Sequence, residues 1–136
     1  MTVTYVSIWE TKILDTIKGF LDDEFKGILD IYIGDRQDSP NAIRIVPLAS
    51  NLISADAIQE TRLYSLEIWF YFSNKSAKLD ILNHVLKYIN RIEALFHDNM
   101  NNTYFDGMIQ RAEIGKEDNG YAIRFDYTCK YAGNMA

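Results

Sequence analysis

Two histidines and one cysteine are the residues of this 136-residue chain that most often bind metals or act in catalysis. His84 and His97 are thirteen residues apart, which turns them about 220° from each other on a helix. They therefore point to different sides and cannot share a metal ion or form an acid–base pair. Cys129 stands in an alternating apolar stretch, which predicts a small buried side chain rather than a nucleophile.

Acidic residues form two further clusters, and neither has the pattern of a functional site. Residues 98–102 (DNMNN) superficially match a calcium loop, but Met100 would be the third ligand position and Ile109 the terminal acid. The adjacent carboxylates of residues 22–24 (DDE) have no partner acid in the sequence, which favours a solvated charge run. The sequence has no phosphate-binding loop and no nucleophile elbow. We expect no catalytic residue, no cofactor and no metal, so the protein is predicted not to be an enzyme.

Charge and composition narrow the class of partner. The formal net charge is −5 and the basic residues are scattered, whereas nucleic-acid binders need clustered Lys and Arg. No apolar run approaches the length of a membrane span, and residues 1–4 do not resemble a signal peptide. The length and the 48% hydrophobic content predict one globular domain over residues 1–136.

Helical periodicity identifies the elements that must position these residues. Ser7 and Glu10 form an S-x-x-E capping box, which predicts a helix start, and Gly27 predicts the end of that helix. A second amphipathic helix is expected over residues 79–96, with Ser76 as its cap.

Alternating apolar residues predict strands between the helices. Residues 28–33 and 42–46 form two short strands, with Pro47 near the end of the second. Residues 48–57 are predicted to be a mildly polar connection. Residues 58–72 then form one strand of about 50 Å, so it either bends or projects as a β-arm paired with the strand before it.

A hairpin closes the chain. Its strands are expected over residues 108–114 and from Tyr121 to Tyr131, with the turn-favouring pair Asn119-Gly120 between them. The last strand alternates apolar and polar residues, which is typical of an antiparallel sheet with one buried face. The order α-β-β-β-α-β-β predicts a two-layer α+β sandwich: a mainly antiparallel sheet with two amphipathic helices on one face and a projecting β-arm.

Large side chains of the long strand divide between its two faces. Tyr64 and Phe70 are expected to face the core, which leaves Leu63, Trp69 and Tyr71 on the opposite face. If the helices cover one face only, these three residues belong to an interface. Alternatively, another part of the same chain covers them.

Several segments together resemble a known family. The most specific is residues 66–72 (LEIWFYF), which run through a short polar turn into the helix of residues 79–96. The opening helix before residues 28–33, the approach of residues 40–45 into the β-arm and the hairpin of residues 108–131 add to it. In element order and size, nearly the whole chain resembles the tail terminator (tail completion) proteins of long-tailed bacteriophages.

The resemblance implies a structural subunit of a ring, usually hexameric, that caps the tail tube and joins it to the head. The implied partners are sister copies, the tail tube protein and a head-completion or connector protein, without a membrane. DNA would pass through the lumen without specific recognition, and we hypothesise that acidic side chains line it. The implied location is the tail-neck region of the virion, after synthesis in the host cytoplasm.

The contacts of such a ring are expected on the open sheet face, the polar loops and the β-arm, because unpaired strand edges and loops on a rigid scaffold bind partners. The predicted interface residues are Leu63, Trp69, Tyr71, Arg36, Gln37, Asn51, Leu52, Ile53 and Asp56.

Two alternatives from other classes stay open. The same element order and acidic balance are similar to specialised secretion chaperones, which form dimers that wrap an effector segment; residues 131–136 are too short for the additional C-terminal helix expected there. A small enzyme would need loop groups such as Asp35, Asp38 and His97 brought together by folding.

Overall fold

The computed structural model describes residues 2–34, 41–73, 81–117 and 120–134. Within these ranges the chain is a mixed α+β fold with one five-stranded sheet and two helices, which confirms the predicted α+β class. In chain order the elements are η1 (Ile8–Leu14), α1 (Asp15–Phe25), β1 (Asp30–Ile33), β2 (Ala42–Ala55), β3 (Gln59–Ser73), α2 (Ile81–Asp98), β4 (Phe105–Glu117) and β5 (Gly120–Asn134).

The first helix begins where the sequence predicts but not in the predicted way. Its first part, η1, is π-helical, and α1 continues it directly. The Ser7 side chain makes no capping hydrogen bond within the described residues, so the predicted capping box is wrong. Instead the Ser7 carbonyl accepts the Thr11 N–H at 3.0 Å. Gly27 has a φ of +76°, a conformation that glycine adopts without strain, and the chain turns there into β1.

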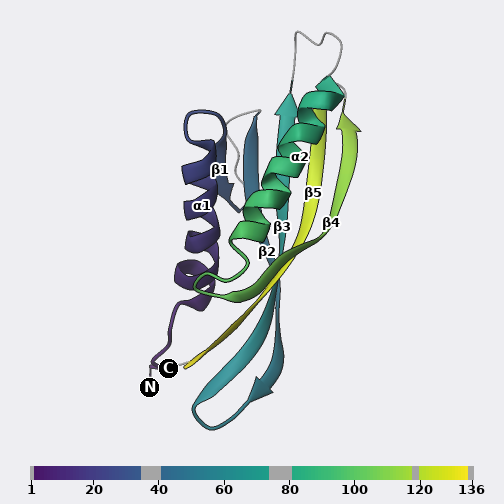
Figure 1. The fold of residues 1–136 in the computed structure, drawn as a ribbon. Coiled ribbons are helices and arrows are strands. Elements are labelled where there is room, and N and C mark those ends of the chain that lie inside the picture. The colour runs from purple at the N-terminus through teal and green to yellow at the C-terminus, as the bar shows by residue number, and fades with distance from the viewer. Residues whose placement is uncertain (1, 35–40, 74–80, 118–119, 135–136) are drawn as a thin grey trace.

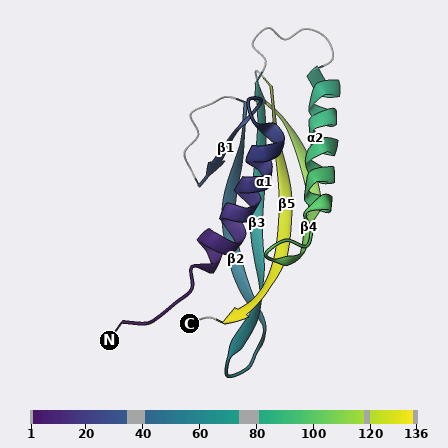
Figure 2. The same cartoon turned by 60° about the vertical axis from the view of Figure 1, so that its left-hand side comes forward.

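The sheet has the strand order β1-β2-β3-β5-β4. Among the described strands, β1 pairs with β2 in parallel and the other three pairings are antiparallel. Both helices lie against the same face, with α1 over the β1–β2 side and α2 over the β5–β4 side (Figures 1 and 2). Because β1 and β4 stand at the two ends of this strand order, they are the edge strands of the sheet.

The core lies between the helices and one face of the sheet. Alternate residues of the central strands point into it, and Ile68, Phe70 and Phe125 have no accessible surface. An edge-to-face aromatic contact links the two layers. The ring centroids of Trp9 in η1 and Tyr64 in β3 lie 4.8 Å apart. The period-two alternation of the strands and the helical spacing of the helices thus place their apolar side chains in one shared cluster.

β2 is much longer than the sequence predicts, because residues 48–55 continue the strand instead of forming a connection. The pairing with β3 tolerates this through two irregularities, between Pro47 and Ala49 and between Leu52 and Ser54. Each irregularity leaves one extra residue, Leu48 and Ile53, as in a β-bulge. Pro47 fits here because proline, which lacks an N–H, is tolerated at bulges and at unpaired strand margins. β4 is also longer than predicted and includes Gly115.

The hairpin of β2 and β3 extends beyond the ends of the helices (Figure 1). We call residues 47–63 the arm. Its β3 strand also pairs with the end of β5, from Arg62 with Tyr131 to Gln59 with Asn134. At its tip the Asp56 carboxylate accepts the N–H groups of Ile58 at 2.7 Å and Gln59 at 2.9 Å. These bonds lower the pKa of Asp56, with the Gln59 N–H the larger cause.

Candidate interaction surface

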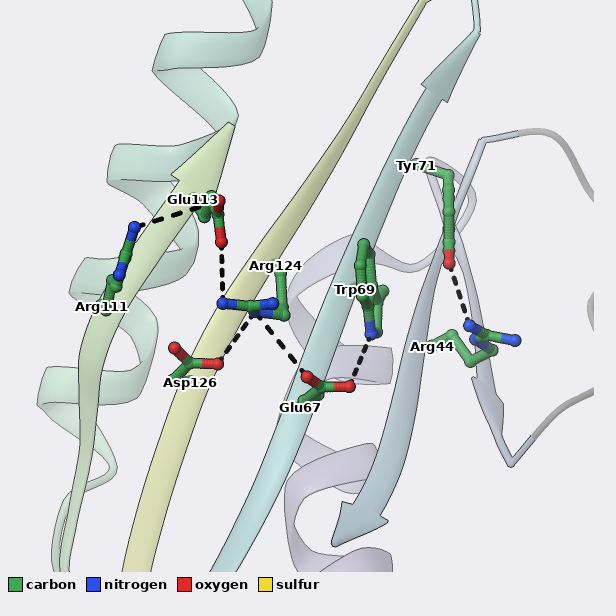
Figure 3. Close-up of polar contacts among 8 residues, drawn as sticks. All are labelled: Arg44, Glu67, Trp69, Tyr71, Arg111, Glu113, Arg124 and Asp126. Atoms are coloured by element: carbon green, nitrogen blue, oxygen red, sulfur yellow. Dashed lines mark hydrogen bonds and ion pairs between the residues drawn. The ribbon is translucent and has the colours of Figure 1, made fainter. Parts of the chain in front are cut away.

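Three predicted interface residues lie on the sheet face that no described helix covers. Leu63, Trp69 and Tyr71 alternate along β3 with the core residues, and each is half-buried. The Trp69 and Tyr71 rings are stacked, with centroids 5.9 Å apart and planes 10° from parallel. Figure 3 shows both side chains on the near side of the strands. We call this surface the open face.

Hydrogen bonds fix the orientation of both aromatic side chains. The Trp69 Nε1–H donates to Glu67 Oε1 at 3.2 Å, and Arg44 Nη2 donates to the Tyr71 hydroxyl at 3.0 Å (Figure 3). Arg44 comes from β2, where it is the register partner of Trp69. The open face therefore holds its aromatic groups in one arrangement before any partner binds.

An ion-pair network continues this surface across three strands. Arg124 of β5 contacts Glu113 at 2.7 Å, Asp126 at 3.1 Å and Glu67 at 3.7 Å, and Glu113 also lies 3.9 Å from Arg111 (Figure 3). All five side chains are partly exposed, so the network stabilises the isolated chain by only about 1 kcal/mol or less. Its main effect is to hold fixed positive and negative charges beside Trp69.

Sequence reasoning missed this network. Glu67 and Asp126 are register partners, as are Glu113 and Arg124. β4 and β5 form the predicted closing hairpin, but Glu67 lies on β3, which is far from that hairpin along the chain. The signal in the sequence was the charged residues that alternate with the apolar residues of the last strand. It could not be used without the register that places those charges opposite Glu67.

A shallow hollow of about 310 Å³ lies beside Trp69. Ala122 and Arg124 of β5 and residues 113–116 of β4 complete its lining. Tryptophan and arginine side chains that are shielded from solvent are among the residues that most often dominate the binding energy of protein interfaces. The hollow mixes charged, apolar and backbone groups, which suits a protein partner better than a small apolar ligand.

The remaining predicted interface residues are distributed differently from the prediction. Arg36 and Gln37 lie outside the described residues. Asn51, Leu52 and Ile53 lie on strand β2 of the arm, so their placement in a connecting loop is wrong. Pairing with β3 holds the backbone of Asn51 and Leu52, and Ile53 is the bulged residue beside them, so the segment cannot act as an adaptable loop.

Asp56 lies at the tip of the arm, and its carboxylate is engaged by the turn itself. Asn51 is the register partner of Leu63, which lies six residues before Trp69 on β3. The structure therefore groups the predicted residues into two surfaces. One is the open face around Trp69 and Tyr71, the other is the arm, and Leu63 belongs to both.

Among the residues that the structure describes, those that could carry catalysis do not converge. Cys129 is fully buried, and burial raises the pKa of its thiol to about 12, which leaves it protonated and inert. His84 and His97 are both exposed on α2. In the ranges that the structure covers, no group of three or more His, Cys, Asp or Glu side chains could hold a metal ion. Asp35 and Asp38 of the enzyme alternative lie outside these ranges.

The acidic run of residues 22–24 is more than a solvated cluster. Asp22 pairs with Lys18 at 2.6 Å, and Glu24 pairs with Arg91 of α2 at 2.7 Å. The Arg91 guanidinium also donates to the Glu24 carbonyl at 3.1 Å, so this arginine links the end of α1 to α2. All three residues are accessible to solvent as predicted, since Asp23 is exposed and the side chains of Asp22 and Glu24 are 46% and 37% exposed.

Comparison with known proteins adds no assignment to these surfaces. No protein-family model matches the chain, and no curated protein matches it significantly in sequence. Across the described ranges, no helix combines the length and apolar character that crossing a membrane requires.

Proposed function

We propose that this protein is a structural subunit of a phage tail-terminator ring, which caps the tail tube and joins it to the head. In this proposal the subunit is a two-layer α+β sandwich whose arm reaches a neighbouring subunit. The observation that carries it is the arm itself, which continues the sheet past the helices and keeps exposed apolar side chains. Leu52, Ile53 and Ile58 are each at least half exposed there, and an isolated chain gains nothing from exposing them.

Self-association is supported by the geometry of the sheet margins. An exposed strand edge presents unpaired N–H and C=O groups, and these add a further strand readily. The arm and the open face are different surfaces of one chain, so a contact between them in successive copies is head-to-tail. Such a contact closes into a ring when its rotation divides a full turn.

The open face supports a second contact in the ring. Its stacked Trp69 and Tyr71, with Arg44 and Arg124 beside them, have the composition of an interface centre rather than of a surface that stays in water. The ion-pair network contains both signs of charge, so it can pair with a neighbour's charges in a defined orientation. We propose the tail tube protein and a head-completion or connector protein as the further partners.

The acidic balance of the chain supports a DNA-conducting lumen. With a net charge of −5, the protein repels the phosphate backbone, so DNA can pass through a ring without specific recognition. We propose that acidic side chains face this channel in the virion neck. An assembled ring with a strongly basic channel would exclude this part of the proposal.

Electron microscopy of the concentrated protein, together with native mass spectrometry, tests the proposal. We expect closed rings of one subunit number, and density from these rings at one end of purified tail tubes. A stable dimer that neither forms rings nor binds tube ends would contradict the terminator function. It would instead favour the dimeric chaperone alternative.

A further inference from the structure

The N-terminal segment of residues 2–7 (TVTYVS) runs outside the sheet and helices. Val3 and Tyr5 are 77% and 73% exposed, although both are large apolar side chains. Within the described part of the chain, no hydrogen bond, ion pair or ring contact involves residues 2–5. Figure 2 shows the segment leaving the start of the first helix and running away from the sheet.

The composition of this segment is that of a strand. Valine, threonine and tyrosine are enriched in strands, because branched and aromatic side chains fit a pleated surface. In extended backbone, period-two alternation places Val3 and Tyr5 on one face and Thr2 and Thr4 on the other. The segment thus has the pattern of a half-buried strand without a described sheet partner in its own chain.

A strand margin that could receive it lies along the arm. β1 pairs with β2 only as far as Ile45, where the Gly34 N–H donates to the Ile45 carbonyl at 2.9 Å. From residue 46 to residue 55, no described strand pairs with this side of β2. Between the two irregularities, residues 49–52 form a regular stretch whose outer backbone groups can pair.

The segment's own arm is a poor partner for it. A hollow of about 460 Å³, lined mainly by apolar atoms, lies between the end of the segment and the arm, with Val6 and Trp9 on one side and Ser50 and Arg62 on the other. The Trp9 ring packs against Tyr64, which anchors the chain just after the segment ends, at the start of the first helix. From this anchored end the segment runs toward the N-terminus and diverges from its own arm (Figure 2).

We infer that residues 2–7 of one copy add as a strand to the β2 margin of the arm, residues 46–55, of a neighbouring copy. The contact is heterologous, because a segment and an arm margin from two different copies meet. Backbone hydrogen bonds supply the pairing, and Val3 and Tyr5 cover apolar side chains of the arm such as Leu52. This inference rests on the proposed self-association and names the segment that carries it.

Disulfide trapping between two distinguishable chains tests the inference. One chain carries Val3→Cys, and a second chain with a mass tag carries a single cysteine at position 49, 50, 51 or 52, which samples the register. Buried Cys129 does not compete for oxidation. We expect a covalent heterodimer from at least one of the four mixtures, and a much lower yield from the control partner Asn90→Cys, whose residue is exposed on α2. Yields no higher than this control in all four mixtures would overturn the inference.

A single chain carrying both cysteines separates exchange from self-pairing. If the Val3→Cys and Asn51→Cys double variant forms only a disulfide within one chain, the segment belongs to its own arm and the inference is wrong. Predominantly interchain disulfides support the exchange between copies.

Charge variants distinguish this inference from the proposed function. We expect the Val3→Asp and Tyr5→Asp double variant to weaken association at least about tenfold, and Thr2→Asp with Thr4→Asp, which adds equal charge on the other face, to weaken it less. Trapped copies that form dimers or open filaments support the inference but contradict the ring. Rings that persist unchanged in the Val3→Asp and Tyr5→Asp variant support the ring but contradict the inference.

Discussion

The two faces of the sheet use alternate residues of the same strands, and they are stabilised in different ways. On the covered face, Phe70 and Phe125 have no accessible surface, and their neighbours are apolar. On the open face, Trp69 and Arg124 are register partners that stay partly exposed and make polar contacts at the strand surface. The covered face depends on filled volume, whereas the open face depends on electrostatic contacts that water and salt weaken.

This contrast explains how one chain can be stable alone and still carry a binding surface. Burial of the covered face supplies the folding free energy, so the open face need not contribute much to it. The open face can then keep aromatic and charged groups ready for a partner at little cost to the fold. Four changes test this division, and they are described from the largest expected effect to the smallest.

Removing a covered-face side chain should produce the largest effect. Phe70→Ala leaves a cavity among fully buried neighbours, and we expect the free energy of unfolding to fall by about 3–5 kcal/mol. Chemical denaturation followed by circular dichroism measures this change. A loss below about 1 kcal/mol would show that the covered face is not the main source of stability.

Alkaline pH should also act through the covered side. Tyr104 is almost fully buried beside Tyr127, and burial raises its pKa to about 12 from the ordinary value of 10.0. Between pH 10 and pH 12 the unfolded chain loses this proton while the folded chain keeps it, so the free energy of unfolding falls as pH rises. The contribution is complete below pH 10 and amounts to on the order of 2 kcal/mol.

Tyr104→Phe provides the comparison for this pH dependence. The variant lacks the titrating hydroxyl, so its stability should fall less steeply than that of the parent protein over the same pH range. Burial raises the pKa of Cys129 in both proteins, so this contribution cancels in the difference. Burial also raises the pKa of Tyr127, and the Tyr104 hydroxyl raises it further, so the difference reports Tyr104 together with its effect on Tyr127. Parallel stability curves for the two proteins would refute the role of Tyr104.

Trp69→Ala changes the neighbour of Phe70 on the other face. It removes the stacking on Tyr71 and the hydrogen bond to Glu67, so we expect a cost of about 1 kcal/mol in folding. Association between copies, measured by sedimentation, should weaken about tenfold or more. Leu63→Ala should show the same preference for assembly over folding. If both variants unfold as readily as Phe70→Ala, this face belongs to the core.

Arg124→Met should have the smallest effect on the isolated chain. It leaves Glu67, Glu113 and Asp126 without their shared cation, and we expect a loss of about 0.5–1 kcal/mol at low salt. The loss should shrink at high salt, because screening weakens repulsion between the exposed carboxylates. Arg111→Met is the control, since Arg111 makes one longer contact of 3.9 Å and should change stability very little. A salt-independent loss would indicate packing rather than charge.

Local pattern was sufficient for the elements with strong periodicity. The alternation from Tyr121 to Tyr131 correctly predicted the buried side chains in the middle of β5, from Ile123 to Cys129, whereas the tyrosines at its two ends are partly buried. The alternation of the long strand correctly placed Tyr64 and Phe70 in the core and Trp69 on the opposite face. Burial on one face requires period two, so this information is contained in the order of residues.

Prediction failed where pairing overrides local preference. Pro47 and the polar residues after it indicate a strand end, but pairing with β3 keeps this segment extended as far as Ala55. The bulges absorb the misfit, and no local signal predicts them. Asn51, Leu52 and Ile53 were therefore identified as contact residues but assigned to the wrong kind of element.

The sequence by itself determined the α+β class, the core faces of the central strands and the inert state of Cys129, because these depend on residue order and side-chain polarity. The tertiary structure decided what depends on register. It placed Arg124 among three carboxylates, joined Glu24 to Arg91 across two helices and left one margin of β2 unpaired along the arm. Contacts between distant segments follow from the way whole elements pack and pair, and neighbouring residues along the chain do not encode them.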